Sequence, residues 1–184
     1  MKKKILICIS IIVILVLVIV VSLFINNKNK VKKVNDIVVE DIINDPNGNI
    51  NQEEILDNSI IGKLTIPKIN LIDVNICESV ELETLSHSLG HFENTNIYEG
   101  NVGLASHNAG TRANYFADIN KLEMGDEIYY KTRYGTKKYL VDNITQINSY
   151  DWSKLEQTED NRITLITCIS GNQNLRLCVQ GVEK

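Results

Sequence analysis

Cys168 stands at the end of a run of β-forming residues, 163–167, and just before a turn-forming Ser-Gly-Asn segment. A second β-forming run begins at Leu175, so the two runs predict a β-hairpin centred on Asn172. In that register Cys168 faces Arg176, with Cβ atoms about 5 Å apart when the two residues pair directly. A cysteine at a strand end, beside a loop, can be reached by a substrate.

An arginine beside a cysteine suits nucleophilic catalysis. The guanidinium of Arg176 would favour the thiolate form of Cys168, which is the reactive form of a cysteine. It could also donate hydrogen bonds to the oxyanion that forms when the thiolate attacks a carbonyl carbon. The alternative is a buried strand cysteine that lies beside a surface arginine and has no catalytic role.

His107 is the candidate acid/base partner of this thiol. It follows another β-forming run, 101–106, and precedes an Asn-Ala-Gly segment, so it also lies where a strand opens into a loop. His107 and Cys168 are far apart in the chain, so only the tertiary fold can bring them together, as is usual for Cys/His pairs. We expect the other two histidines, His87 and His91, to be structural.

Short β-forming runs punctuated by Gly, Asn and Asp fill the chain from residue 60 onward, which predicts a mostly β domain built as a closed or nearly closed barrel. A hairpin tip is predicted at 134–136, and helices are predicted at 80–87 and 113–122, the second with apolar residues at helical spacing. The predicted strands are 60–66, 71–77, 101–106, 127–133, 137–147, 162–168 and 175–181.

The N-terminal third of the chain has a different composition. Residues 5–25 are almost unbroken Ile, Leu and Val, and a helix of that length crosses a hydrocarbon core of about 30 Å, so they predict a transmembrane anchor. A cleavable signal peptide is the alternative, but no small-residue cleavage site follows the run. Lysines flank both ends, so charge alone does not assign residues 1–4 to one side. Residues 26–59 predict a polar stalk, and residues 60–184 the folded domain.

Charge and cysteine usage exclude several classes of partner. Residues 34–184 hold 12 basic and all 23 acidic residues, a net charge of −11, which argues against nucleic acid and against electrostatic binding to an anionic membrane surface. Four cysteines, at 8, 77, 168 and 178, show no CxxC pair and no dense spacing, so we expect neither a disulfide scaffold nor a zinc site. Cys77 and Cys178 are expected to be buried small hydrophobic residues rather than a disulfide.

Several segments, in order along the chain, resemble the sortase family of cysteine transpeptidases. Residues 164–168, TLITC, resemble the TLxTC signature, and Arg176 falls where sortases carry their arginine, near the start of the last strand. The segments 90–95, 100–102 and 105–107 resemble the stretch that leads to the catalytic histidine, and residues 115–126 resemble the helix and turn after it. The resemblance runs from about residue 60 to residue 182. It departs at Ser106, where many members have Gly before the histidine.

The resemblance implies an eight-stranded sortase-type barrel and a transpeptidation. Cys168 would attack the Thr–Gly bond of an LPxTG-like sorting signal near the C-terminus of a surface protein, and an amine of a peptidoglycan precursor would resolve the thioester acyl-enzyme. His107 would protonate the departing amine and deprotonate the incoming one, while Arg176 would stabilise the transition state. Thr167 would help to bind the substrate, or is simply a β-former in its strand. The resemblance also places the N-terminus in the cytosol and the catalytic domain outside a Gram-positive cell.

A housekeeping-like or class D-like sortase is the expected class. No second apolar span follows Val182 and no aromatic-bearing lid precedes Ile60, which argues against the pilin-polymerising layout, and the segment 148–161 is too short for the helix-bearing insertion of the iron-acquisition class. The alternatives are a pilin-polymerising sortase that uses a subunit lysine, and a catalytically silent anchored β-domain that binds wall ligands. No cofactor or metal is expected. Some relatives bind calcium through acidic loop residues, but the loop acids here form no specific motif: Glu93, Glu99, Glu159 and Asp160.

Overall fold

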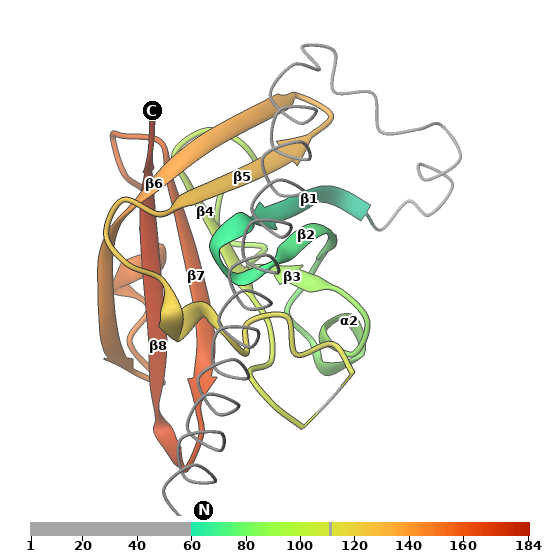
Figure 1. Ribbon diagram of the computed structural model, residues 1–184, viewed down its shortest axis with the longest axis vertical. Helices are drawn as coiled ribbons and strands as arrows, with labels where there is room; N and C mark the ends of the chain where they lie inside the picture. Colours follow the sequence, from blue (N-terminus) through green and yellow to red (C-terminus); the bar gives the residue numbers. More distant parts are fainter. Residues whose placement is uncertain (1–59, 111) are drawn as a thin grey trace, which may run out of the picture. The chain divides into compact units, whose positions relative to one another are not determined.

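Figure 1 shows the computed structural model, which describes residues 60–110 and 112–184. The predicted cytosolic N-terminus, anchor and stalk, residues 1–59, lie outside the described residues. Within the part that is described, no helix has the length and apolar character needed to cross a bilayer.

Eight strands of the described chain close into one barrel, in the order β1-β2-β3-β4-β7-β8-β6-β5. The mostly β, eight-stranded fold class is therefore confirmed. Neighbours are antiparallel except for two pairs, β2 with β3 and β4 with β7. The strands are β1 (Ile60–Ile66), β2 (Leu71–Glu78), β3 (Leu89–His91), β4 (Asn101–Ala105), β5 (Glu127–Thr132), β6 (Gly135–Asn148), β7 (Arg162–Ile169) and β8 (Asn172–Glu183).

Seven of these strands lie where alternation and turn residues place them, and the eighth, β3, is new. β3 has three residues and is held by its neighbours: it pairs with β2 on one side and β4 on the other. A strand of this length carries too little local signal to stand out in the sequence. The predicted hairpin tip at 134–136 shifts slightly, because Thr132 pairs with Gly135 and the turn is at Arg133 and Tyr134.

The helices are shorter than predicted. The stretch 80–87 contains only α2 (Leu82–Leu85), and the stretch 113–122 contains turns and one 3-10 element, η3 (Ile119–Lys121). The prediction of a helix over 113–122 is therefore wrong, although Phe116, Ile119 and Leu122 are buried as their spacing suggested. Backbone groups of this stretch bond to the chain after β4 instead: the Phe116 amide donates to the His107 carbonyl at 3.2 Å. Two further 3-10 elements are η2 (Pro67–Ile69) and η4 (Ser153–Leu155).

Two apolar clusters stabilise the domain. The larger fills the barrel and includes Tyr130, Tyr139 and Phe116. The smaller lies on one outer face, where α2 and η4 pack against the sheet; it is made of Leu85, Phe92, Ala105, Ile147, Leu155, Ile166 and Cys178. Cys77 and Cys178 are both buried, as predicted.

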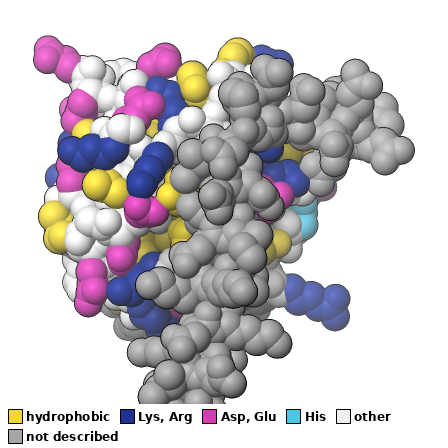
Figure 2. All heavy atoms as spheres, turned by 45° about the horizontal axis from the view of Figure 1, so that its top comes forward, with side chains coloured by type: hydrophobic (Ala, Val, Ile, Leu, Met, Phe, Trp, Pro, Cys, Tyr) yellow, Lys and Arg dark blue, Asp and Glu magenta, His cyan; other side chains and the backbone are white. Residues whose placement is uncertain are grey.

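Acidic and basic side chains are interspersed over the described surface that Figure 2 shows. Ion pairs join neighbouring strands, for example Lys138 with Glu127 at 2.6 Å and Arg162 with Asp142 at 2.9 Å. Such exposed or half-exposed pairs contribute little stability each, so the barrel depends mainly on its two apolar clusters.

Candidate active site

The site is built on the outer face of the sheet formed by β4, β7 and β8. Side chains two residues apart on a strand share a face of the sheet. On the outer face, the register of β7 with β8 sets three residue pairs one after another, which we call levels. Thr164 pairs with Gln180 at the first level, Ile166 with Cys178 at the second, and Cys168 with Arg176 at the third. The levels are polar, apolar and chemically reactive in turn.

The hairpin of β7 and β8 has the predicted register up to the reactive pair and departs from it just beyond. Residues pair from Arg162 with Val182 through to Cys168 with Arg176, as expected for a hairpin centred on Asn172. The register then shifts, because Ile169 pairs with Asn172. The turn is therefore tighter than predicted and uses Gly171 with φ +79, a conformation that favours glycine.

Cys168 is exposed, whereas Arg176 is half-buried and held in place. The Nη1 group of Arg176 donates to the carbonyls of Gln173 and Leu175, both at 2.9 Å. An arginine has five N–H donors. These two bonds orient the guanidinium, and its other N–H groups can donate to a negatively charged oxygen.

His107 lies two residues beyond the end of β4, in a loop that is hydrogen-bonded to the end of β7. The residue before it is fixed twice: the Thr167 hydroxyl donates to the Ser106 carbonyl at 2.7 Å, and the Ser106 hydroxyl donates to the Ala113 carbonyl at 3.2 Å. Ser106 thus joins the chain before His107 to Ala113, farther along the same loop. Thr167 is buried, and its hydroxyl joins β7 to the chain before His107.

One pocket of about 260 Å³ brings the predicted site residues together. His107, Thr167, Cys168 and Arg176 all line it. Apolar side chains form much of the remaining wall: Val80, Leu82, Leu85, Phe92, Ala105, Ile147 and Ile166. The segment between β6 and β7 adds Asp151 and Trp152, and the Trp152 ring meets Phe92 edge-on at a centroid distance of 6.0 Å. The pocket thus joins an apolar wall to a thiol, an imidazole and a guanidinium.

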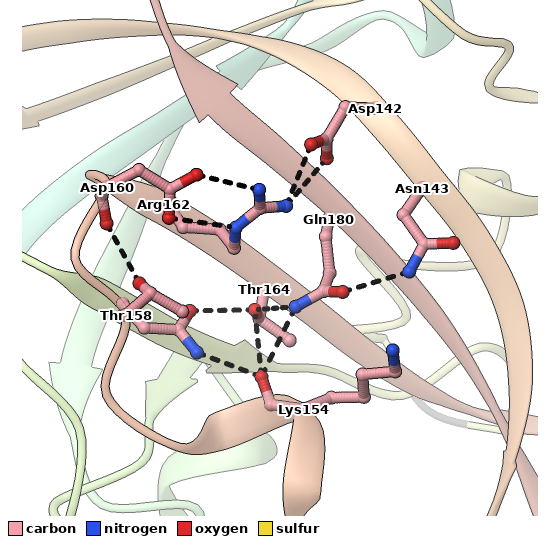
Figure 3. A network of polar contacts seen from close by, with 9 residues as sticks. Asp142, Asn143, Lys154, Thr158, Asp160, Arg162, Thr164 and Gln180 are labelled. Carbon is pink, nitrogen blue, oxygen red and sulfur yellow. Dashed lines mark hydrogen bonds and ion pairs between the residues drawn. The ribbon is translucent and has the colours of Figure 1, made fainter.

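The polar level of the sheet anchors the segment between β6 and β7, a role that was not predicted from the sequence (Figure 3). Asn101 is fully buried and donates through Nδ2 to the carbonyls of Lys154 and Glu156, both at 2.9 Å. The Thr164 hydroxyl donates to Asn101 Oδ1 at 2.8 Å. Gln180 Nε2 donates to Thr164 Oγ1 at 3.1 Å and to the Lys154 carbonyl at 3.3 Å.

These bonds hold η4 against β4, β7 and β8. Lys154 of η4 lies three residues after Asp151, which lines the pocket. The signal that could have revealed the network is the presence of amide side chains at positions where strand alternation predicts burial, since buried polar groups need hydrogen-bond partners.

The other histidines lie outside the pocket, as expected of structural residues. His91 is buried, its Nδ1 is 2.7 Å from Glu78 Oε1, and its Nε2 is 3.0 Å from the Asn96 carbonyl. These contacts join β2, β3 and the loop that leads to β4. His87 is exposed, two residues beyond the end of α2.

The loop acids considered for calcium are in part paired with cations. Asp160 contacts Arg162 at 2.8 Å, and Glu99 contacts Lys137 at 3.4 Å. Across residues 60–110 and 112–184, no three His, Cys, Asp or Glu side chains gather in a way that could hold a metal ion.

Comparison with known proteins identifies the family. The family model of the sortase domain matches residues 64–184 of this sequence. The chain belongs to the sortase family. Sortase A from Bacillus anthracis is 32% identical over 115 residues, which cover 62% of this chain and 55% of that protein. Sortase A from Staphylococcus aureus is 30% identical over 84 residues, which cover 44% of this chain and 41% of that protein.

Solved sortase structures share the fold. Sortase A from Corynebacterium diphtheriae superposes with a TM-score of 0.63 at 27% identity, over 68% of this chain and 60% of that one. Sortase C-1 from Streptococcus pneumoniae has a TM-score of 0.64 at 26% identity, over 69% of this chain and 68% of that one. The chain spans about half the length of the curated relatives that it matches, at 41% to 55%.

Proposed function

We propose that the chain is a membrane-anchored cysteine transpeptidase that cleaves an LPxTG-like sorting signal and transfers the surface protein to an amine of a peptidoglycan precursor. The observation that carries the proposal is that His107 from the loop after β4, Cys168 from β7 and Arg176 from β8 line a single pocket in a sortase domain. The apolar wall beside them suits the apolar residues of such a peptide.

In the proposed acylation, the Cys168 thiolate attacks the carbonyl carbon of the Thr–Gly bond. The resulting oxyanion accepts hydrogen bonds from Arg176, whose guanidinium is oriented by its own hairpin. As the C–N bond breaks, His107 gives its proton to the departing amine, and a thioester joins the substrate to Cys168. The direct pairing of Cys168 with Arg176 supports this division of roles.

In the proposed second half, an incoming amine loses its proton to His107 and attacks the thioester carbonyl. A new amide bond forms, the C–S bond breaks, and the Cys168 thiolate is released. Thr167 is proposed to aid substrate binding through its position in the pocket wall. No step uses a metal ion or a cofactor. Residues 5–25 are proposed as the single-pass anchor in a Gram-positive cell membrane, with residues 60–184 outside.

Thiol labelling and peptide cleavage test the proposal. Iodoacetamide at neutral pH should alkylate Cys168 faster than Cys77 or Cys178, as mapped by mass spectrometry. Burial raises the pKa of Cys178 to about 11, so this thiol stays protonated and serves as an internal control. Cys168→Ala should abolish cleavage of an LPxTG-type peptide, and His107→Ala and Arg176→Ala should lower kcat by about 10²–10³-fold.

Matched controls are His87→Ala and Arg133→Ala, two exposed residues outside the pocket. Both should retain wild-type cleavage. Slow and equal labelling of Cys77, Cys168 and Cys178, with no cleavage, would instead favour a β-domain that binds wall ligands without catalysis.

A pilin-polymerising role is the second candidate. Solved sortase C structures, such as Sortase C-1 from Streptococcus pneumoniae, match this fold as well as Sortase A does. In that role the resolving amine is a lysine side chain of another subunit. A peptide library assayed with a short peptide bearing a free N-terminal amine, and separately with a lysine-bearing peptide, distinguishes the two by the ligated product.

A further inference from the structure

We propose that Asn108 is a positioning residue that holds Cys168 in place relative to His107, an inference that rests on the proposed function of the site. Asn108 directly follows His107 in the chain. Its Nδ2 group donates to the backbone carbonyl of Cys168 at 2.6 Å. The residue after the proposed acid/base group is thus bonded to the proposed nucleophile itself.

The contact lies where regular strand pairing ends. The parallel pairing of β4 with β7 stops at Ala105 and Ile166, two residues before Cys168. Beyond that point, hydrogen bonds from side chains join the two segments. Thr167 donates to the Ser106 carbonyl at 2.7 Å, and Asn108 donates to the Cys168 carbonyl. The two bonds enclose His107 in sequence, one through the residue before it and one through the residue after it.

The bond to Asn108 also lies at a weak point of the hairpin. The pairing of β7 with β8 shifts register between Cys168 and Ile169. Such bulges interrupt the ladder and bend the strand locally. The Asn108 carboxamide binds on both sides of this shift, because Nδ2 also lies 3.3 Å from Ser170 Oγ. It therefore restrains the peptide plane after Cys168, on which the direction of the thiol depends.

This restraint should matter for chemistry more than for folding. Asn108 is only half-buried, so its removal leaves no deeply buried polar group unpaired. A small displacement of a reacting group, however, can cost about a hundredfold in rate. For Asn108→Ala we expect kcat for peptide cleavage to fall by about ten- to a hundredfold, with KM nearly unchanged and a urea midpoint close to that of the wild type.

A double-mutant cycle tests the inference on the full chain. The readout is the alkylation rate of Cys168 by iodoacetamide, measured from pH 6 to pH 9 in the wild type, His107→Ala, Asn108→Ala and the double variant. If Asn108 sets the geometry between imidazole and thiol, removing His107 should change the rate at least about threefold less in the Asn108→Ala background. Ser170→Ala, which keeps the bond to the Cys168 carbonyl, should have a smaller effect than Asn108→Ala. Asn114→Ala, an exposed asparagine of the same loop, should behave as the wild type.

The cycle separates failure of this inference from failure of the proposed function. Alkylation needs no peptide substrate, so the coupling between residues 107 and 108 is measured even if no sorting signal is cleaved. Equal effects of His107→Ala with and without Asn108 would overturn the inference. It is also overturned if His107→Ala leaves the alkylation rate of Cys168 unchanged while Asn108 is present. His107 then has no effect on the thiol that Asn108 could maintain.

Discussion

Asn101→Ala probes how the polar level of the sheet supports the pocket. Asn101 is 0% exposed and makes three hydrogen bonds, two to the carbonyls of Lys154 and Glu156 and one from the Thr164 hydroxyl. The substitution removes all three. The Lys154 carbonyl keeps the bond from Gln180 and lies 3.3 Å from the Thr164 hydroxyl, which can turn to it. The Glu156 carbonyl has no such replacement in the network.

The magnitude follows from these contacts. Three lost hydrogen bonds at about 1 kcal/mol each, with the Glu156 carbonyl left without this donor, lower the free energy of unfolding by about 3–4 kcal/mol. This is a large fraction of the roughly 5–15 kcal/mol that stabilises an ordinary domain. With a urea m-value of about 2 kcal/mol/M, the midpoint should fall by about 1.5–2 M.

Urea denaturation followed by two probes measures the effect. Far-ultraviolet circular dichroism reports the barrel. Fluorescence reports the segment tied down by the network, because Trp152 is the single tryptophan of the chain and lies two residues before Lys154. We expect the fluorescence transition of the variant to precede the dichroism transition. The control is Asn120→Ala, at an exposed position of η3, which should shift the midpoint by less than about 0.3 M. A midpoint for Asn101→Ala as close to the wild type as that of the control would refute the reasoning.

Two further substitutions test the packing and the electrostatics of the domain. A Cβ at residue 90 would lie 2.5 Å from the Ser79 carbonyl oxygen and 2.8 Å from Leu85 Cδ2. Gly90→Ala should therefore destabilise the fold by about 1–3 kcal/mol in a urea titration and raise KM by displacing α2 from the pocket. An unchanged urea midpoint would contradict this. The hydrogen bond from Arg162 lowers the pKa of Asp160, so the ion pair stabilises the fold above the unfolded-state pKa of about 3.9 and loses that contribution as the pH falls through the lower folded value. The difference in Tm between the wild type and Asp160→Asn should accordingly be constant from pH 7 to pH 5 and shrink once the pH falls below about 3.9. A difference that stays the same as the pH falls below that value would disprove the assignment.

The local elements of this domain could be predicted from the sequence. Alternating β-forming runs placed seven strands within a few residues of their bounds, and the pairing of Cys168 with Arg176 has the predicted register, although the register shift between Cys168 and Ile169 was not predicted. These features depend on interactions between residues close together in the chain. A hairpin register follows from turn length and from which face is buried, so a window of about twenty residues contains the needed information.

Other features depended on the closed barrel. The parallel pairing of β4 with β7 brings His107 near the end of the strand that holds Cys168, and nothing near either residue in the sequence specifies it. Backbone groups of 113–122 also bond to the loop after β4: the Phe116 amide donates to the His107 carbonyl, and the Ala113 carbonyl accepts from the Ser106 hydroxyl. These contacts take the place of the helix that the spacing predicted.

What the sequence by itself determined, then, is seven of the eight described strands, the reactive hairpin and the identity of three candidate catalytic side chains. Only the tertiary structure decided that Asn101 anchors one wall of the pocket and that Asn108 bonds to the Cys168 carbonyl. Asparagine is ordinary in turns and loops, so its type carries little information. Its partners here are carbonyl groups more than fifty residues away in the chain, and such bonds exist only once the barrel has closed.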